Sequence, residues 1–167
     1  MKEKFKFAFM DCAERFAQLS TATRAKVGAI IVKDNRIISI GYNGMPSGWT
    51  NECETTTTWN DVPHMREKYI QDGAVMHDSP HGATWSRKRT KPEVLHAETN
   101  AIAKVAQSNE NCKDATLFCT HEPCMDCAKL IYQSGIKTVI FKHTYKADKG
   151  SGREFLEKSG CNVEHIQ

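Results

Sequence analysis

The sequence has no long apolar run, no strong excess of charge of either sign and no segment typical of an export signal. Its apolar stretches are far shorter than the roughly 20 residues that a membrane-spanning helix needs. Residues 1–6 mix charges with aromatic side chains and lack the apolar stretch and small-residue cleavage site of a signal peptide. We therefore expect a soluble, cytoplasmic protein with no membrane partner.

The charge balance also excludes a class of partner. The 23 basic and 20 acidic residues leave a net charge of +3, spread along the chain. A nucleic-acid-binding protein usually has a concentrated basic face, so we expect no nucleic-acid partner, whereas an anionic small molecule remains compatible. A chain of 167 residues is long enough for one domain with a core around a pocket.

Cysteine is not scarce, but its number and context argue against disulfides. The seven cysteines are an odd count in a chain without an export signal. A reducing compartment is the better interpretation, and it leaves five cysteines as ordinary apolar residues and two as metal ligands.

The spacing of apolar residues predicts alternating helices and strands. An amphipathic helix over residues 3–19 should bury one face, with side chains at steps of three and four: Phe5, Phe9, Cys12, Phe16 and Leu19. We expect further elements as follows: a hairpin of 27–32 and 37–40, a helix over 97–107, a strand over 116–120, and two helices that end at Gly135 and Gly160, each followed by a strand, over 139–141 and 163–166. This order predicts an α/β fold in which a mixed sheet lies between two helix layers.

Residues 45–94, called the insertion below, show no clear periodicity. Such a long irregular stretch is unusual inside a domain, so we expect a functional insertion with one short helix near 65–71 and no second domain.

Two short motifs carry the chemistry. His96-Ala97-Glu98 stands at the start of a predicted helix, and Pro123-Cys124-Met125-Asp126-Cys127 stands at a strand-to-helix junction. Either motif alone is weak evidence, but in this order they match the signature of the zinc-dependent deaminases of nucleobases. His96, Cys124 and Cys127 would bind one zinc ion and leave its fourth position open for water. Glu98 would act as the general acid and base during hydrolytic deamination of a cytosine-type base.

Other interpretations of the motifs stay open. Cys119 or His121 is close enough in sequence to be a fourth ligand of a purely structural zinc site. Redox chemistry at Cys124 and Cys127 would leave His96 and Glu98 without a role. A non-catalytic nucleotide sensor would not need Glu98.

At these motifs the chain resembles the deoxycytidylate (dCMP) deaminase family, especially its phage-encoded members. The likeness runs from about Arg24 to Phe155 and includes these segments: Lys26-Val27-Gly28-Ala29, Gly41-Tyr42-Asn43-Gly44-Met45-Pro46, the insertion, the two zinc motifs with Ala128-Lys129, and Gln133-Ser134-Gly135-Ile136-Lys137. The resemblance implies a five-stranded αβα sandwich of the cytidine deaminase type, the substrate dCMP and the product dUMP for thymidylate synthesis. It also implies a homohexamer, activation by dCTP with Mg²⁺, inhibition by dTTP and, for a phage protein, the host cytoplasm. Deaminases of other cytosine nucleotides, such as dCTP, or of nucleosides or a tRNA base remain alternatives.

The resemblance also suggests ligand-binding residues. Gly41, Tyr42, Asn43 and Gly44 match the effector motif; Gly41 and Gly44 are also found in a turn after a strand, but Tyr42 and Asn43 between them favour the functional interpretation. Asn43 matches an asparagine that contacts the base in related deaminases.

Three further residues are candidates for substrate binding. Tyr145 follows the strand 139–141, where family members carry an aromatic side chain beside the substrate, but an exposed tyrosine is nearly as plausible. Arg24 and Lys26 precede the first strand and would bind the 5′-phosphate, or else lie on a solvated turn. Basic residues within 146–149 are less specific candidates.

The sequence departs from the family pattern at one place. Some phage relatives bind a second zinc through a cysteine just before the first strand, where this chain has Ser20-Thr21-Ala22-Thr23. Cys53 and the three histidines of the insertion match no known spacing for a metal site. We therefore expect one zinc per subunit.

Overall fold

The structure is a computed structural model that describes residues 1–145 and 150–167. Its central sheet has five strands in the order β2-β1-β6-β7-β8. The strands are β1 (Gly28–Lys33), β2 (Arg36–Tyr42), β6 (Thr116–His121), β7 (Thr138–His143) and β8 (Asn162–His165). β1 pairs antiparallel with both β2 and β6, whereas β6, β7 and β8 run parallel to one another. The predicted mixed sheet is confirmed.

The predicted hairpin is confirmed as β1 and β2. Its two turn residues, Asp34 and Asn35, have φ values of 50° and 58°. Two consecutive positive φ angles are typical of the type I′ turn that joins twisted antiparallel strands, and Asp and Asn tolerate this conformation better than most residues.

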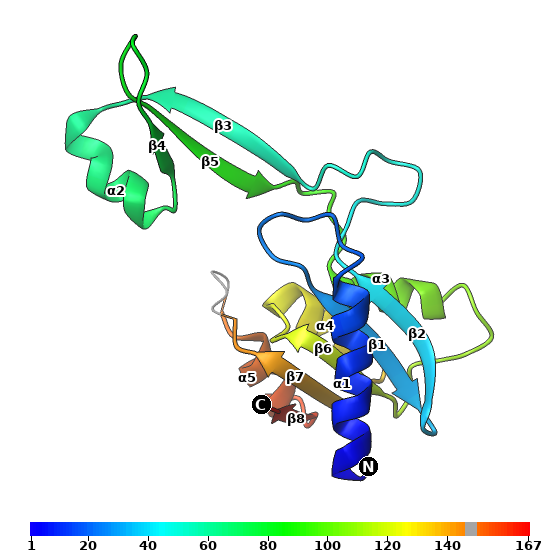
Figure 1. The fold of residues 1–167 in the computed structure, drawn as a ribbon. Helices are drawn as coiled ribbons and strands as arrows, with labels where there is room; N and C mark the ends of the chain where they lie inside the picture. Colours follow the sequence, from blue (N-terminus) through cyan, green and yellow to red (C-terminus); the bar gives the residue numbers. More distant parts are fainter. Residues whose placement is uncertain (146–149) are drawn as a thin grey trace.

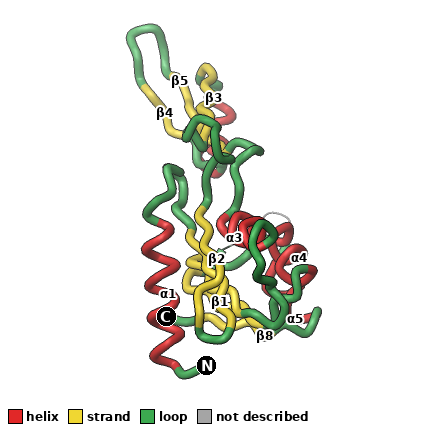
Figure 2. The backbone as a smooth tube through the Cα atoms, turned by 90° about the vertical axis from the view of Figure 1, so that its right-hand side faces the viewer, coloured by secondary structure: helices red, strands yellow, loops and turns green. Residues whose placement is uncertain are grey.

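Helices cover both faces of the sheet, as Figure 2 shows. One face packs on α1 (Glu3–Ala17), and the other packs on α3 (Ala97–Val105), α4 (Met125–Gln133) and α5 (Gly152–Lys158). Neighbouring strand residues alternate between the two cores: Ile30 and Phe118 face α1, while Ile31 and Leu117 face the other helices. The three-layer αβα sandwich is therefore confirmed.

The predicted buried face of α1 needs correction. The fully buried residues are Met10, Ala13 and Ala17, whereas Phe5 and Leu19 are 40% and 55% exposed. A Cβ on Gly28 would lie 2.0 Å from the carbonyl oxygen of Ala13, so α1 approaches β1 through its small residues. The larger side chains of the predicted stripe, such as Phe9 and Phe16, flank this contact and are only partly buried.

The insertion is ordered, which corrects the expectation of an irregular segment. It contains the antiparallel strands β3 (Glu54–Asn60), β4 (Val75–His77) and β5 (Thr84–Thr90), in the order β3-β5-β4. A 3₁₀ turn (Pro63–Met65) and α2 (Arg66–Gln71) join β3 to β4, and α2 confirms the predicted short helix. Figure 1 shows this small sheet standing apart from the central one. That the whole chain forms one domain stays a prediction.

Composition explains why the small sheet had no visible period in the sequence. The side chains of β3 and β5 are mostly threonines and charged residues that face solvent. Its apolar packing comes from three aromatic rings. The centre of the Tyr69 ring, in α2, lies 5.3 Å from the centre of the Trp59 ring and 5.2 Å from that of Trp85. Trp85 is buried and donates a hydrogen bond from Nε1 to Asp61 at 2.7 Å. One aromatic per strand is too little to produce an alternating pattern.

Two findings bear on the chain as a whole. Among the described residues, no helix is both long and apolar enough to cross a bilayer. All seven cysteines, each within the described ranges, are free thiols.

Candidate active site

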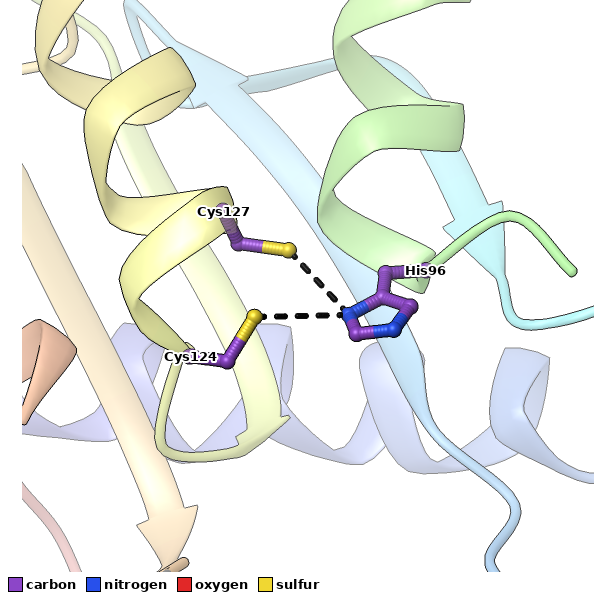
Figure 3. A group of neighbouring side chains, drawn as sticks. All are labelled: His96, Cys124 and Cys127. Carbon is purple, nitrogen blue, oxygen red and sulfur yellow. Dashed lines mark hydrogen bonds between the residues drawn. The ribbon is translucent and has the colours of Figure 1, made fainter. Parts of the chain in front are cut away.

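Three potential metal ligands meet at the starts of two helices. His96 immediately precedes α3, Cys124 immediately precedes α4, and Cys127 lies in the first turn of α4. Both preceding residues have extended backbone, which turns their side chains across the ends of the helices. Figure 3 shows the imidazole and the two thiols pointing toward one another.

The distances fit a tetrahedral zinc site. His96 Nδ1 lies 3.3 Å from the Sγ of Cys127 and 3.6 Å from the Sγ of Cys124. Zinc bonds of about 2.0 Å to nitrogen and about 2.3 Å to sulfur place tetrahedral ligands about 3.5 Å apart. Imidazole and thiolate are also preferred donors for this ion. The three residues therefore fit zinc both in chemistry and in spacing.

The pKa values of the two thiols are shifted in opposite directions. A hydrogen bond with Cys127 is the largest cause that lowers the pKa of Cys124, to about 4. The same pairing, together with burial, raises the pKa of Cys127. The positive ends of the two helix dipoles favour negative charge at this point. The lowered pKa of Cys124 favours its thiolate, the form in which cysteine binds zinc.

Glu98 lies beside this cluster in the first turn of α3 and is only 4% exposed. Burial is the largest influence on its carboxyl group and raises its pKa above 4.5. Hydrogen bonds from its own backbone N–H and from Cys127 act in the opposite direction. A carboxyl group in this environment exchanges protons more readily near neutral pH than one in water.

A cavity of about 340 Å³ opens onto these residues. His96, Glu98 and Cys124 line it, and so do three of the predicted substrate-binding residues, Arg24, Asn43 and Tyr145. The sequence thus located residues that are 121 positions apart in the chain (145 − 24) and share one cavity.

Lys26 does not share this cavity. It is exposed, whereas its chain neighbours Ala25 and Val27 line the wall. That Lys26 binds the substrate phosphate stays a prediction, because it is not among the residues that line the cavity. The basic residues proposed within 146–149 lie outside the described residues.

The side chain of Asn43 has a structural task as well as a place in the cavity wall. Its Oδ1 accepts the N–H of Val27 at 2.8 Å, and its Nδ2 donates to the carbonyl of Ala25 at 2.8 Å. Both bonds fix the segment before β1. An amide group retains one more donor hydrogen and one more lone pair for a ligand.

The predicted effector motif divides between two cavities and the core. Tyr42 and Gly44 line a second cavity of about 420 Å³, together with residues that include Asn100 and Lys104. Gly41 lines neither cavity, because it lies against α3, where a Cβ would meet the carbonyl oxygen of Ala97 at 2.1 Å. Asn43 lines the first cavity. The four neighbouring residues 41–44 thus lie in three different environments: against α3, along the first cavity and along the second cavity.

The cavity also has lining residues that the sequence did not suggest as substrate contacts. His121 and Glu122 line the first cavity, and their place just before Pro123-Cys124 was a usable signal. Glu54 and Thr90 also line it, from the first residue of β3 and the last residue of β5. The sequence pattern indicated a functional insertion, with His64, His77 and His81 as loop or nucleotide-contact residues, but did not single out Glu54 or Thr90.

Neither alternative fourth ligand joins the cluster. Cys119 is fully buried in the core, and burial raises the pKa of its thiol well above the usual range. The His121 Nδ1 lies 3.0 Å from the hydroxyl of Thr120. Within residues 1–145 and 150–167, the one group of three suitable donor side chains is His96, Cys124 and Cys127. A three-ligand site open to a cavity is typical of catalytic rather than structural zinc.

The residues considered for a second metal site are dispersed. Cys53 is buried with Ala22 and Val94 and lies 3.4 Å from the hydroxyl of Thr21. His77 contacts Ser86 at 2.6 Å on the small sheet, and His64 and His81 are exposed. These donors do not converge among the described residues.

Fold and site together define a class. A mixed sheet whose helices begin at His-x-Glu and Pro-Cys-x-x-Cys is the arrangement of the zinc-dependent deaminases of nucleobases. Comparison with known sequences agrees with this class. The family described as "Cytidine and deoxycytidylate deaminase zinc-binding region" matches residues 3–143.

Individual relatives narrow the class further. The deoxycytidylate deaminase of Enterobacteria phage T4 is 34% identical over 166 residues, which cover 90% of this chain and 83% of the relative. Human deoxycytidylate deaminase is 36% identical over 135 residues, 80% of this chain and 61% of the relative. The structure of the cyanophage S-TIM5 dCMP deaminase in complex with dCMP and dUMP matches with a TM-score of 0.75 and 38% identity, covering 99% of both chains. The chain belongs to the cytidine and deoxycytidylate deaminase family and contains its zinc-binding domain.

Proposed function

We propose that this protein hydrolyses dCMP to dUMP and ammonia, with zinc bound by His96, Cys124 and Cys127. The observation that carries this proposal is that two of these ligands, His96 and Cys124, border one cavity together with the buried Glu98 and the cationic Arg24. The crystallised S-TIM5 relative, which holds dCMP and dUMP, supports the choice of substrate. The product would supply thymidylate synthesis, in the host cytoplasm if the gene is carried by a phage.

Bound zinc supplies a Lewis acid that increases the acidity of water at its open position. Glu98 accepts a proton from the attacking water and delivers it to the ring nitrogen N3 as the new C4–O bond forms. The same carboxyl group then carries the second proton of this water to the amino group, and the C4–N bond breaks to release ammonia. Water and dCMP are thus converted to dUMP and ammonia, with Glu98 returned to its starting state.

The remaining cavity residues would bind the rest of the nucleotide. Arg24 would pair with the 5′-phosphate, which a guanidinium group can contact with two parallel hydrogen bonds. Asn43 would use its remaining amide hydrogen-bonding capacity toward the substrate. The ring of Tyr145, which is 52% exposed at the cavity edge, would stack on the pyrimidine.

The second cavity is our candidate for the effector site. Tyr42 and Gly44 line it, and Lys104 is the basic residue in its wall, with Nζ 5.6 Å from the centre of the Tyr42 ring. An aromatic ring and a cation suit the base and the phosphates of a nucleotide. We propose that dCTP with Mg²⁺ activates the enzyme from this site, that dTTP inhibits it there, and that the enzyme is a homohexamer.

A substrate panel tests the main proposal. Ammonia release is measured with the zinc-loaded protein and dCMP, dCDP, dCTP, deoxycytidine, cytidine and an adenosine-bearing tRNA stem-loop. We expect the highest kcat/KM for dCMP. Release from cytidine or the stem-loop alone would overturn the nucleotide assignment.

The effector proposal needs a separate measurement. Rates at subsaturating dCMP are measured with dCTP plus Mg²⁺ or with dTTP, for the wild type and for Lys104→Ala. We expect opposite effects of the two nucleotides in the wild type and a loss of both in the variant. Light scattering during size exclusion gives the mass, and a mass other than six chains would contradict the hexamer.

A further inference from the structure

The insertion meets the rest of the protein at the wall of the active-site cavity. Glu54 and Thr90 face each other in the β3–β5 ladder, at the end of the small sheet nearest the central one. Figure 1 shows these strand ends close to the loop that follows α1. Both residues line the cavity that also contains His96 and Glu98. The root of the insertion therefore belongs to the site, whereas its tip lies far from it.

The carboxylate of Glu54 holds the backbone of the loop before β1. Its Oε1 accepts the N–H of Thr23 at 2.8 Å and the N–H of Arg24 at 3.2 Å. This part of the loop has no helix or strand pairing of its own. Hydrogen bonds to a charged acceptor are stronger than neutral ones, so Glu54 restrains the backbone of these two residues.

Thr90 contacts the side chain of the same arginine. The guanidinium Nη1 of Arg24 donates a hydrogen bond to the Thr90 hydroxyl at 3.2 Å. One pair of opposed residues in the ladder thus fixes both the backbone and the side chain of Arg24. An exposed arginine otherwise loses much rotamer freedom when it binds a ligand, and prior orientation removes part of that cost.

We propose that Glu54 and Thr90 are positioning residues that hold Arg24 in the orientation in which it binds the substrate phosphate. This inference rests on the proposed function, because it takes the cavity to hold a nucleoside monophosphate. It assigns the insertion a role in substrate recognition through its first ladder pair.

The test is a double-mutant cycle between Glu54 and Arg24, with dCMP as the substrate. Loss of hydrogen bonds to a charged acceptor predicts that Glu54→Ala raises KM about tenfold and changes kcat less than about twofold. If Glu54 acts through Arg24, Glu54→Ala adds less than about twofold to the KM of Arg24→Ala. Independent, multiplying effects in the double variant, or a loss confined to kcat, would overturn the inference.

Conservative variants separate positioning from general folding. Glu54→Gln keeps an oxygen that accepts both N–H groups, so its KM should stay within about twofold of the wild type. Thr90→Val keeps the shape but removes the acceptor, so its KM should rise about fivefold. This second variant keeps the inference testable even if Glu54→Ala does not fold.

Matched controls come from β3 and the segment just before it. Glu52→Gln removes a nearby exposed carboxylate that pairs with Lys91 at 3.7 Å, and Thr56→Val alters an exposed threonine of the same ladder. Both should leave KM unchanged. A wild type without dCMP turnover would refute the proposed function, whereas an active wild type with an additive cycle would refute only the positioning role.

Discussion

At the scale of single residues, the proposed chemistry depends most on Glu98. It is almost fully buried next to the metal ligands, and burial raises its pKa. Burying a carboxyl group costs stability, because desolvation penalises its charged form. A non-catalytic nucleotide sensor would have no use for this arrangement.

The first prediction concerns Glu98→Gln. An amide of the same size cannot transfer protons, so we expect kcat to fall by about 10²- to 10⁴-fold. Zinc content, measured by elemental analysis, should stay the same because Glu98 is not a ligand. Removing a buried carboxyl group should also leave the melting temperature unchanged or higher at pH 7. Activity that survived this change would contradict the mechanism.

A second prediction at this scale concerns His121 in the cavity wall. Burial first, and the nearby His143 second, lower the pKa of His121 below 6.5. A histidine with a depressed pKa in the folded protein contributes stability that is present above its unfolded pKa and is lost as pH falls. Between pH 7 and pH 5, the melting temperature of the wild type should therefore fall more than that of His121→Gln. Equal pH dependence of the two proteins would contradict this prediction.

At the scale of elements, close contacts between helices and strands position the site. Gly41 of β2 lies against α3, the helix that begins just after His96 and carries Glu98. A side chain at this point would push α3 away from the sheet. The family motif that includes Gly41 and Gly44 therefore combines a packing position with a cavity position.

The two glycines should respond differently to alanine. Gly41→Ala places a Cβ 2.1 Å from the Ala97 carbonyl, and overpacking of this kind lowers the free energy of unfolding by about 1–3 kcal/mol. At Gly44 the nearest atoms are those of the Tyr42 ring at 3.8 Å, so stability should change by less than about 0.5 kcal/mol. Urea denaturation of the zinc-loaded proteins measures both. Similar losses at the two positions would contradict the proposed division of the motif.

At the scale of the whole molecule, the metal cluster joins two segments that are 28 residues apart. Zinc binding should therefore stabilise the fold, since the ligands converge only when α3 and α4 are both packed on the sheet. One cluster per chain among the described residues supports one zinc per subunit.

The corresponding prediction is made for the purified protein. Elemental analysis should find one zinc per chain, and a chelator should abolish deamination and lower the melting temperature, both reversed by added zinc. Cys127→Ser should lose the metal, whereas Cys12→Ser, which changes a partly buried cysteine of α1, should retain it. Two zinc ions per chain would show that a second site has been missed.

The sequence alone determined the central sheet, its helices and the zinc motifs, because these features are local. Apolar runs mark β1 and β6, glycines with positive φ follow α4 and α5, and the ligands stand in short motifs at the starts of α3 and α4. The sequence could not reveal the ordered sheet of the insertion, because β3 and β5 each contribute one tryptophan to its packing and most of their other side chains are polar or charged.

Only the tertiary structure decided which residues share the cavity. Arg24 and Asn43 reach it while Lys26 and Gly41 do not, because the direction of a side chain depends on the packing of its neighbours. Glu54 and Thr90 join the site through a strand ladder that brings positions 36 residues apart (90 − 54) into one pair. Such a contact depends on long-range pairing, which leaves no mark on the residues nearby in the chain.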